Sequence, residues 1–186
     1  MPANDNPHAI RLYESLTRNV GEDAAREIMQ GNPLSKAADH EKKFRWAERI
    51  CAGLERTLDH DAVKKVRMDC ACGPDTGKIS KLTKLFQSSS HFCEFAEKVN
   101  ALNEGFTVNA ERDALFLVYP QCYCSCVKRV TKPISQTWCY CTLGYTKKMF
   151  EGILGRDVYV ELISSVKTGG ESCVIKITPR ELSCVN

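Results

Sequence analysis

The hydrophobic positions change their spacing near residue 105, and this change divides the chain into two patterns. Before Gly105, apolar residues recur every three or four positions, which is typical of amphipathic helices. Polar and glycine-containing breaks interrupt the pattern and predict where the helices end. The breaks are Gly21, residues 31–33 (GNP), residues 59–61 (DHD), residues 72–77 (CGPDTG) and residues 88–90 (SSS). Residues 1–104 are therefore predicted to form a bundle of short helices.

Two of the apolar helix stripes include a cysteine. The helix near residues 36–58 aligns Phe44, Ala47, Cys51, Leu54 and Leu58. The next clear helix aligns Phe92, Phe95, Ala96, Val99 and Leu102, and Cys93 falls on its stripe. A free cysteine in such a position behaves as a small apolar side chain. We therefore expect Cys51 and Cys93 to be buried in the core without a chemical role.

After Gly105 the pattern becomes rich in β-branched and aromatic residues, which favour strands. Two such runs flank a polar turn at 111–113, and this arrangement predicts a hairpin. A helix follows, opened by Ser135 or Thr137 as N-cap and ended by Gly155. A second hairpin follows with a tight turn at Gly169–Gly170. The predicted fold class is α+β, in which residues 105–186 form a ββαββ antiparallel sheet packed on helix, in one compact unit with the helical region.

Composition adds a few limits to this picture. The 186 residues are 43% hydrophobic and 26% charged, which is typical of a globular protein that can bury a core. The start lacks a basic stretch followed by an apolar run, and no stretch reaches the ~18 apolar residues of a membrane span. A soluble, cytoplasmic protein is expected. The net charge of +3 is too small to indicate a nucleic-acid or anionic membrane partner.

The unusual chemistry of the chain is its 11 cysteines. An odd number cannot all pair internally, and a reducing compartment favours thiols or metal ligands over disulfides. Seven of them fall in three groups with one residue between neighbours, DCACG, CYCSC and WCYC. These seven are Cys70, Cys72, Cys122, Cys124, Cys126, Cys139 and Cys141. We predict that they supply the ligands of one metal site, with buried or reactive free thiols, and then disulfides, as the alternatives.

The spacing of these groups constrains any such site. Alternate residues of a strand lie about 6.6 to 7 Å apart, whereas zinc holds sulfur at ~2.3 Å, so CYCSC must bend to serve one ion. Cys139 and Cys141 open the predicted helix, where free N–H groups favour thiolate over thiol. The four histidines show no metal-binding spacing and are expected at the surface or as helix caps. They are His8, His40, His60 and His91.

Residues 137–177 carry a more specific pattern. They contain a cysteine that opens a helix ending in Gly-Arg, then a strand, then a Gly-Gly-Glu-x-Cys hairpin. This order resembles the vinyl-reductase-type (4-vinyl reductase) small-molecule-binding domain superfamily, which includes 2-aminothiazoline-carboxylate hydrolase-like proteins. The resemblance covers only the last third of the chain. It implies the same ββαββ arrangement and a binding pocket between sheet and helices.

The resemblance also implies a zinc site. Its ligand positions fall on Cys139 and Cys173, and on Leu162 and Ser165, which cannot bind zinc. The resemblance therefore implies that zinc was lost or that the site was rebuilt from other thiols of the clustered groups. We prefer the rebuilt site, because it explains the density of cysteines.

These observations lead to three functional hypotheses. The first is a cysteine-ligated, zinc-binding protein that binds or senses a small, apolar molecule, with Tyr119, Trp138 and Tyr145 as candidates to line its pocket. The second is a cysteine-dependent hydrolase of small amide or thiazoline substrates, with Cys139, Cys141 or Cys173 as nucleophile, although the second half contains no histidine base. The third is an iron–sulfur or thiol-redox protein, although the spacings match no ferredoxin pattern. The sequence leaves a homodimer open.

Overall fold

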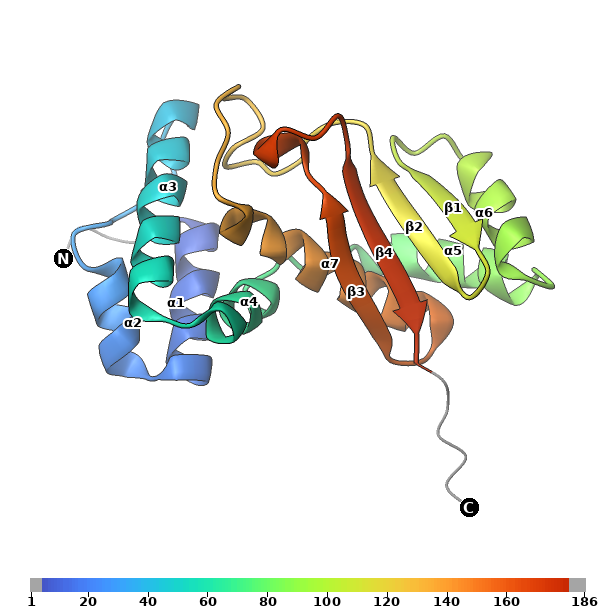
Figure 1. Cartoon of the computed structure of the whole chain (residues 1–186), viewed down its shortest axis with the longest axis horizontal. Coiled ribbons are helices and arrows are strands. Elements are labelled where there is room, and N and C mark those ends of the chain that lie inside the picture. Colours follow the sequence, from blue (N-terminus) through green and yellow to red (C-terminus); the bar gives the residue numbers. More distant parts are fainter. Residues whose placement is uncertain (1–4, 181–186) are drawn as a thin grey trace, which may run out of the picture. The chain divides into compact units, whose positions relative to one another are not determined.

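The computed structural model describes residues 5–180, and within them the protein is a mixed α+β structure (Figure 1). Seven helices and four strands occur in this part of the chain, with most of the helices before the first strand. The helices are α1 Pro7–Val20, α2 Glu22–Met29, α3 His40–Thr57, α4 His60–Asp69, α5 Thr76–Gln87, α6 Phe92–Asn100 and α7 Gln136–Leu154. The strands are β1 Thr107–Glu111, β2 Ala114–Tyr119, β3 Val158–Ser164 and β4 Cys173–Pro179. The predicted α+β class is confirmed at this level.

The helix boundaries follow the breaks in the sequence because several breaks contain a capping side chain. The carboxylates of Asp39, Asp59 and Asp75 accept hydrogen bonds from backbone N–H groups in the first turns of α3, α4 and α5, at 2.7 to 2.8 Å. Each bond satisfies an N–H that has no partner within its helix. Gly21 separates α1 from α2 with a φ of 95°, which a residue with a side chain rarely adopts. The predicted helix ends are thus confirmed.

The chain forms two compact units that interleave along the sequence. Unit 1 comprises the residues up to Cys72 together with Cys122–Gly144 and Lys167–Gly169. Unit 2 comprises Gly73–Gln121, Tyr145–Val166 and the residues from Gly170 onward. Helix α7 begins in unit 1 and ends in unit 2. The predicted boundary near residue 105 stays a prediction.

Unit 1 contains the bundle of α1 to α4 (Figure 1). Helix α1 packs on α2 and α4, and α2 packs on α3. Two tryptophans lie in the interior, Trp46 of α3 and Trp138 of α7, with their rings edge to face at 5.6 Å. Aromatic pairs of this geometry add stability beyond the area they bury.

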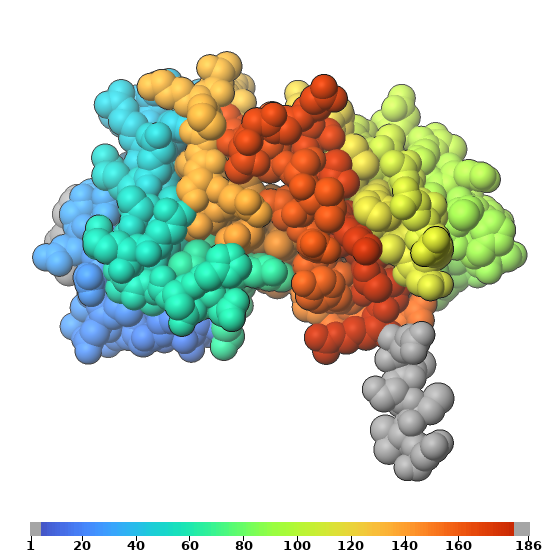
Figure 2. Space-filling model, viewed as in Figure 1, coloured from blue at the N-terminus to red at the C-terminus, as the bar shows by residue number. Residues whose placement is uncertain are grey.

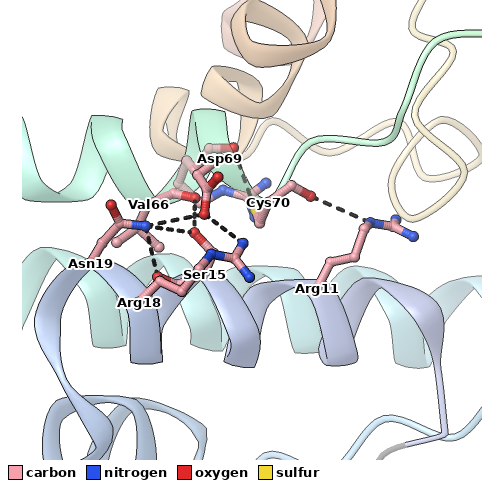
Figure 3. A network of polar contacts seen from close by, with 8 residues as sticks. Arg11, Ser15, Arg18, Asn19, Val66, Asp69 and Cys70 are labelled. Carbon is pink, nitrogen blue, oxygen red and sulfur yellow. Dashed lines mark hydrogen bonds and ion pairs between the residues drawn. The ribbon is translucent and has the colours of Figure 1, made fainter. Parts of the chain in front are cut away.

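Figure 3 shows how polar contacts join α1 to α4 inside unit 1. The hydroxyl of the buried Ser15 donates to the carbonyl of Val66 at 2.9 Å. At the edge of the same contact, Arg18 and Asn19 both bond the Asp69 carboxylate, at 2.7 and 3.1 Å. Burial opposes ionisation of Asp69, but these hydrogen bonds outweigh it and lower the pKa of the carboxyl group. The end of α4 is therefore fixed against α1.

Unit 2 contains the antiparallel sheet, in the strand order β1-β2-β4-β3. Leu117 pairs with Ile175, and Val160 with Ile177, and these side chains form the buried face. Figure 1 shows α5 and the second half of α7 behind the sheet. On the other face of the edge strand β3, Tyr159 and Ile163 are about half exposed, at 53% and 51%. The sheet thus has one apolar face and one face directed to solvent.

The two hairpins differ in how well they were predicted. Strands β1 and β2 meet at the predicted polar turn, where Glu111 pairs with Ala114. Strands β3 and β4 also pair, and Gly169 has the predicted positive φ, but the connection is longer than a tight turn at Gly169–Gly170. Residues 165–172 connect them through a short 3₁₀ turn, because the N–H of Gly170 donates back to the carbonyl of Ser165 at 2.9 Å. Gly169, with a φ of 97°, allows this reversal.

None of the helices within residues 5–180 is long and apolar enough to cross a membrane.

Candidate functional site

All seven clustered cysteines belong to unit 1. Cys70 and Cys126 are buried, Cys72 is exposed, and the other four are intermediate in exposure. Cys51 is buried in α3 as predicted, whereas the prediction for Cys93 is wrong, because its side chain is exposed on α6. Cys93 lies next to Phe92 but about 100° around the helix from it, outside the buried stripe. Cys184 lies outside the described residues.

The CYCSC group is a turn rather than a strand. Strand β2 ends at Tyr119, before Pro120, which has no N–H to donate to a sheet. The carbonyl of Cys124 accepts from the N–H groups of Val127 and Lys128, at 3.1 and 2.9 Å, so the chain curls immediately after it. We call residues 122–135 the cysteine segment. Figure 2 shows that its later part lies at the surface beside α3.

A buried arginine lies at the centre of the site. Arg67 of α4 is only 3% exposed, and its guanidinium group lies 4.2 Å from the centre of the Trp138 ring. It donates to the carbonyl oxygens of Thr137 and Trp138, at 3.3 and 2.9 Å, and to the sulfur of Cys70 at 3.2 Å. The thiol of Cys70 in turn donates to the Arg67 carbonyl at 3.3 Å. Arg67 thereby holds the start of α7 against the end of α4.

The position of this charge is electrostatically unusual. Arg67 lies beside the first turn of α7, where the helix dipole is positive and disfavours a cation. Among the described residues, no carboxylate forms an ion pair with it. A buried ion without a counter-charge costs several kcal/mol. A negative group near Arg67 is therefore favoured, and the nearby ionisable groups that act on it are thiols, Cys70, Cys141, Cys51 and Cys124.

Cys124 is the thiol that best meets this requirement. Its sulfur accepts a hydrogen bond from the indole N–H of Trp138 at 3.3 Å. A hydrogen bond from the Cys126 thiol, with smaller contributions from Trp138, the Cys126 backbone N–H and the Arg67 charge, outweighs burial and lowers the Cys124 pKa to about 6. The same bond, with burial, raises the pKa of Cys126, so the pair carries one proton on Cys126. We call Arg67, Cys70, Cys124, Cys126 and Trp138 the arginine–thiol cluster.

Neighbouring thiols remain protonated. Burial raises the pKa of Cys51 to about 12 and also raises the pKa of Cys141. The sequence-based expectation that the helix start favours a thiolate at Cys141 is therefore wrong. Cys141 lies in the second turn of α7, deep enough for desolvation to exceed the effect of the helix dipole.

A second arginine contacts the cysteines from α1. The Arg11 guanidinium donates to the sulfur of Cys72 at 3.2 Å and to the carbonyl of Cys70 at 3.4 Å, the second of which is drawn in Figure 3. It also donates to Nδ1 of His8 at 3.2 Å, which places the proton of the neutral ring on Nε2. That nitrogen bonds the hydroxyl of Ser125 at 2.9 Å. Arg11 and His8 therefore tie the turn between Cys124 and Cys126 to α1.

His8 differs from the other three histidines. His91 caps α6, and His40 and His60 are exposed, as predicted. His8 is partly buried, and burial together with the charge of Arg11 lowers its pKa to about 4. It is therefore neutral at physiological pH and acts as a structural link.

The far end of the cysteine segment is held by a buried lysine. The ammonium group of Lys167 donates to the carbonyl oxygens of Val130 and Lys132, the second at 3.4 Å. The N–H of Ile134 donates to the Lys167 carbonyl at 3.0 Å. The segment is thus anchored at Ser125 and again between Val130 and Ile134, and Cys124, next to the first anchor, is partly exposed.

A groove of about 360 Å³ lies between α3 and the end of the cysteine segment. Two carboxylates of α3, Glu48 and Glu55, line it together with Cys51, Ala52, Pro133, Ile134 and Ser135. The hydroxyl of Ser135 donates to Glu55 and accepts from the N–H of Thr137 at 3.2 Å, so Ser135 caps α7. Of the predicted pocket residues, Trp138 belongs to the core of unit 1, whereas Tyr119 and Tyr145 belong to unit 2.

The zinc prediction is wrong, and so is its iron–sulfur alternative. Within residues 5–180, no group of three or more His, Cys, Asp and Glu side chains could hold a metal ion. The sulfurs of Cys70 and Cys124 instead accept hydrogen bonds from Arg67 and from the Trp138 indole. That the seven thiols share one site stays a prediction.

Sequence patterns contained only part of this site. They identified the cysteines, but they missed Arg67, Arg11, His8 and Lys167. One signal was present for Arg67, which stands three residues before Cys70 in a predicted helix and therefore on the same face. Arg11 and Lys167 are far from the cysteines in sequence, and no local pattern points to them.

The comparisons with known proteins correct the expected resemblance. A model of a family described as "Family of unknown function (DUF6144)" matches residues 6–184. No curated protein matches the chain. The chain is similar to H-NOX structures, including an Fe(II) unliganded H-NOX protein from K. algicida, with 13% identity, coverage of 96% of this chain and 98% of that chain, and a TM-score of 0.48.

A second similar structure is an H-NOX protein from S. oneidensis in the Fe(II)NO ligation state, with 13% identity, coverage of 95% and 99%, and a TM-score of 0.46. The matched family is not the vinyl-reductase type, so the expected family is corrected, and with it the hydrolase alternative that the resemblance implied. The zinc-dependent binding function and the iron–sulfur alternative are corrected because no group within residues 5–180 could hold a metal ion. Because the family model spans nearly the whole chain, the protein belongs to the family of unknown function DUF6144.

Proposed function

We propose that this protein binds small electrophilic molecules covalently, through a thioether formed at Cys124. The observation that carries the proposal is the buried Arg67 guanidinium, which has no carboxylate partner among the described residues and lies in the cluster that also contains the Cys124 sulfur. Hydrogen bonds from Trp138 and Cys126 favour the thiolate of Cys124. The thiolate is the nucleophilic form of cysteine.

The chemistry requires no other component. Because its pKa is lowered to about 6, Cys124 is largely ionised at pH 7, and thiols whose pKa lies near the ambient pH react fastest. The sulfur electron pair forms a bond to an electrophilic carbon. With a haloacetamide, the carbon–halogen bond breaks and halide leaves. With an α,β-unsaturated carbonyl, sulfur adds to the β carbon and the α carbon takes a proton from water.

The other thiols of unit 1 are less suited to this reaction. Burial raises the pKa values of Cys51 and Cys141, and the hydrogen bond that Cys126 gives to Cys124, together with burial, raises the pKa of Cys126. Cys124 is therefore expected to react before these three thiols.

Haem is not part of the proposal. The two similar H-NOX proteins are in Fe(II) states. With 13% identity and TM-scores of 0.46 and 0.48, they do not indicate a cofactor for this chain. A haem iron is commonly held by a histidine. Both ring nitrogens of His8 are engaged by Arg11 and Ser125, and the groove on α3 is lined without histidine, so these residues do not fit a haem.

The test is the rate of alkylation of each cysteine by iodoacetamide, measured on the full reduced chain by mass spectrometry of its peptides. Cys124 should react first, with a rate that rises with pH through a midpoint near 6 because the thiolate is the reacting form. The chain denatured in urea is the reference, because it has lost the hydrogen bonds to the Cys124 sulfur, and there Cys124 should show the midpoint of a model thiol, about 8.5. A common midpoint for Cys124 in the folded and the denatured chain would exclude the proposal.

A matched pair of variants tests the source of the reactivity. Cys126→Ser keeps a side-chain donor beside Cys124, whereas Cys126→Ala removes it. The midpoint at Cys124 should therefore stay low in the serine variant and rise in the alanine variant. Equal midpoints in the two variants would show that the hydrogen bond from residue 126 does not lower the pKa.

A further inference from the structure

We infer that Cys124 selects electrophiles that carry a negative charge, such as a carboxylate next to the reactive carbon. This inference rests on the proposed function and adds the class of molecule that the site takes. It is carried by the distribution of charge around the cysteine segment. The segment contains Lys128, Arg129 and Lys132 and no acidic residue.

Positively charged side chains lie near Cys124 on more than one element of the structure. The backbone N–H of Lys128 donates to the Cys124 carbonyl, so Lys128 and Arg129 belong to the turn that follows the thiol. Both side chains are exposed to solvent. Arg67 of α4 adds a buried positive charge that acts on Cys124. Clefts lined by charge of one sign raise the local concentration of the opposite ion.

Helix α1 adds further positive charge on the same side. Arg11 bonds His8, and His8 bonds Ser125, the residue next to Cys124. The charges that act on His8 are those of Arg11, Arg67 and Lys43, all of them positive. His8 itself is neutral at physiological pH. Arg11 of α1 and Arg67 of α4 therefore add positive charge next to the turn of residues 124–129.

The groove on α3 shows the opposite character. Its charged lining residues are Glu48 and Glu55, and the charge of Glu55 further raises the pKa of Cys51 at its floor. The charged side chains that line the groove are thus acidic, whereas those of the cysteine segment around Cys124 are all basic. An anionic electrophile is therefore attracted to the turn of Cys124, while burial keeps Cys51 protonated.

The experiment compares iodoacetate with iodoacetamide, which place the same leaving group on carbon and differ by one negative charge. The full reduced chain is treated with both reagents in competition at fixed neutral pH, and the two products at Cys124 are counted by mass spectrometry. The chain denatured in urea gives the reference ratio. At low ionic strength, the ratio of iodoacetate to iodoacetamide product should be about tenfold higher in the folded chain. The preference should disappear at about 1 M salt, because added ions screen it.

Variants locate the charge that causes the preference. A Lys128→Gln, Arg129→Gln chain should lose most of the preference while still reacting with iodoacetamide. A Lys84→Gln, Arg112→Gln chain, which loses a lysine and an arginine exposed in unit 2, should keep it. Equal ratios in folded and denatured chains, or a preference that survives in the first variant, overturn this inference. Failure of Cys124 to react with either reagent overturns the proposed function instead.

Discussion

The two units place their polar and charged groups differently. In unit 1, Arg67 and Lys167 are buried and hold carbonyl oxygens and a thiol. In unit 2, the ion pairs are partly exposed, as in the contact of Lys147 with Glu151 at 2.6 Å, and the described interior is an apolar sheet face. A buried charge destabilises the fold unless hydrogen bonds or an opposite charge compensate it. Arg67 and Lys167 are compensated by the groups that they hold in place. The difference indicates that unit 1 carries the chemistry and that unit 2 is built as an apolar scaffold.

The largest expected effect tests how tightly each half of α7 is packed. A Cβ at Gly144, in unit 1, would lie 1.9 Å from the backbone oxygen of Met68, whereas a Cβ at Gly152, in unit 2, would meet a methyl group of Ile79 at 3.0 Å. Gly144→Ala must displace backbone and should reduce the free energy of unfolding by about 4 kcal/mol. Gly152→Ala should cost less than about 2 kcal/mol because a side chain can move.

Urea unfolding of the two variants measures this difference. Equal losses would mean that the close approach of α4 and α7 is not a constraint, and the contrast between the two halves of the helix would fail.

The second prediction compares the buried and the exposed cation. Arg67→Met leaves two carbonyl oxygens and the Cys70 sulfur without their donor, and should reduce the free energy of unfolding by about 3 kcal/mol. Lys147→Met removes partly exposed ion pairs with Glu151 and Asp157 and a hydrogen bond to the Val158 carbonyl, and should cost only about 1 kcal/mol. Thermal unfolding of both variants gives the comparison.

Arg67→Met has a second readout that a purely structural role would not change. Loss of the positive charge should raise the pKa of Cys124, which moves the midpoint of its alkylation to higher pH. Lys147→Met should leave that midpoint unchanged. If Arg67→Met lowers stability but keeps the midpoint, then Arg67 serves packing alone.

The smallest effect concerns one cysteine of each unit. Cys51→Ala removes a buried sulfur from the core of unit 1 and should cost about 1 kcal/mol. Cys93→Ala changes an exposed side chain and should alter the free energy of unfolding by less than about 0.5 kcal/mol. Chemical denaturation of each variant measures both changes in the free energy of unfolding. A larger loss for Cys93→Ala would contradict its exposure on α6.

Much of the fold could be predicted because it depends on local signals. The caps Asp59 and Asp75, the helix end at Gly155 and the turn after β1 all act within a few residues of their position in sequence. The strand order β1-β2-β4-β3 could not be predicted, because a pattern of alternating residues does not state which strand is its neighbour.

The candidate site likewise combines features that follow from the sequence with features that depend on the tertiary structure. The sequence by itself determined that seven cysteines fall in three close groups, and that helices precede an antiparallel sheet. Only the tertiary structure decided what the cysteines do, because the pKa of a thiol depends on groups distant in sequence. Trp138 and Arg67 approach Cys124 from two other elements, while burial keeps Cys141 protonated although it has the same CxC spacing. Hydrogen bonding and desolvation act through space at a few ångströms, so the same residue type becomes an acid at one position and an apolar side chain at another.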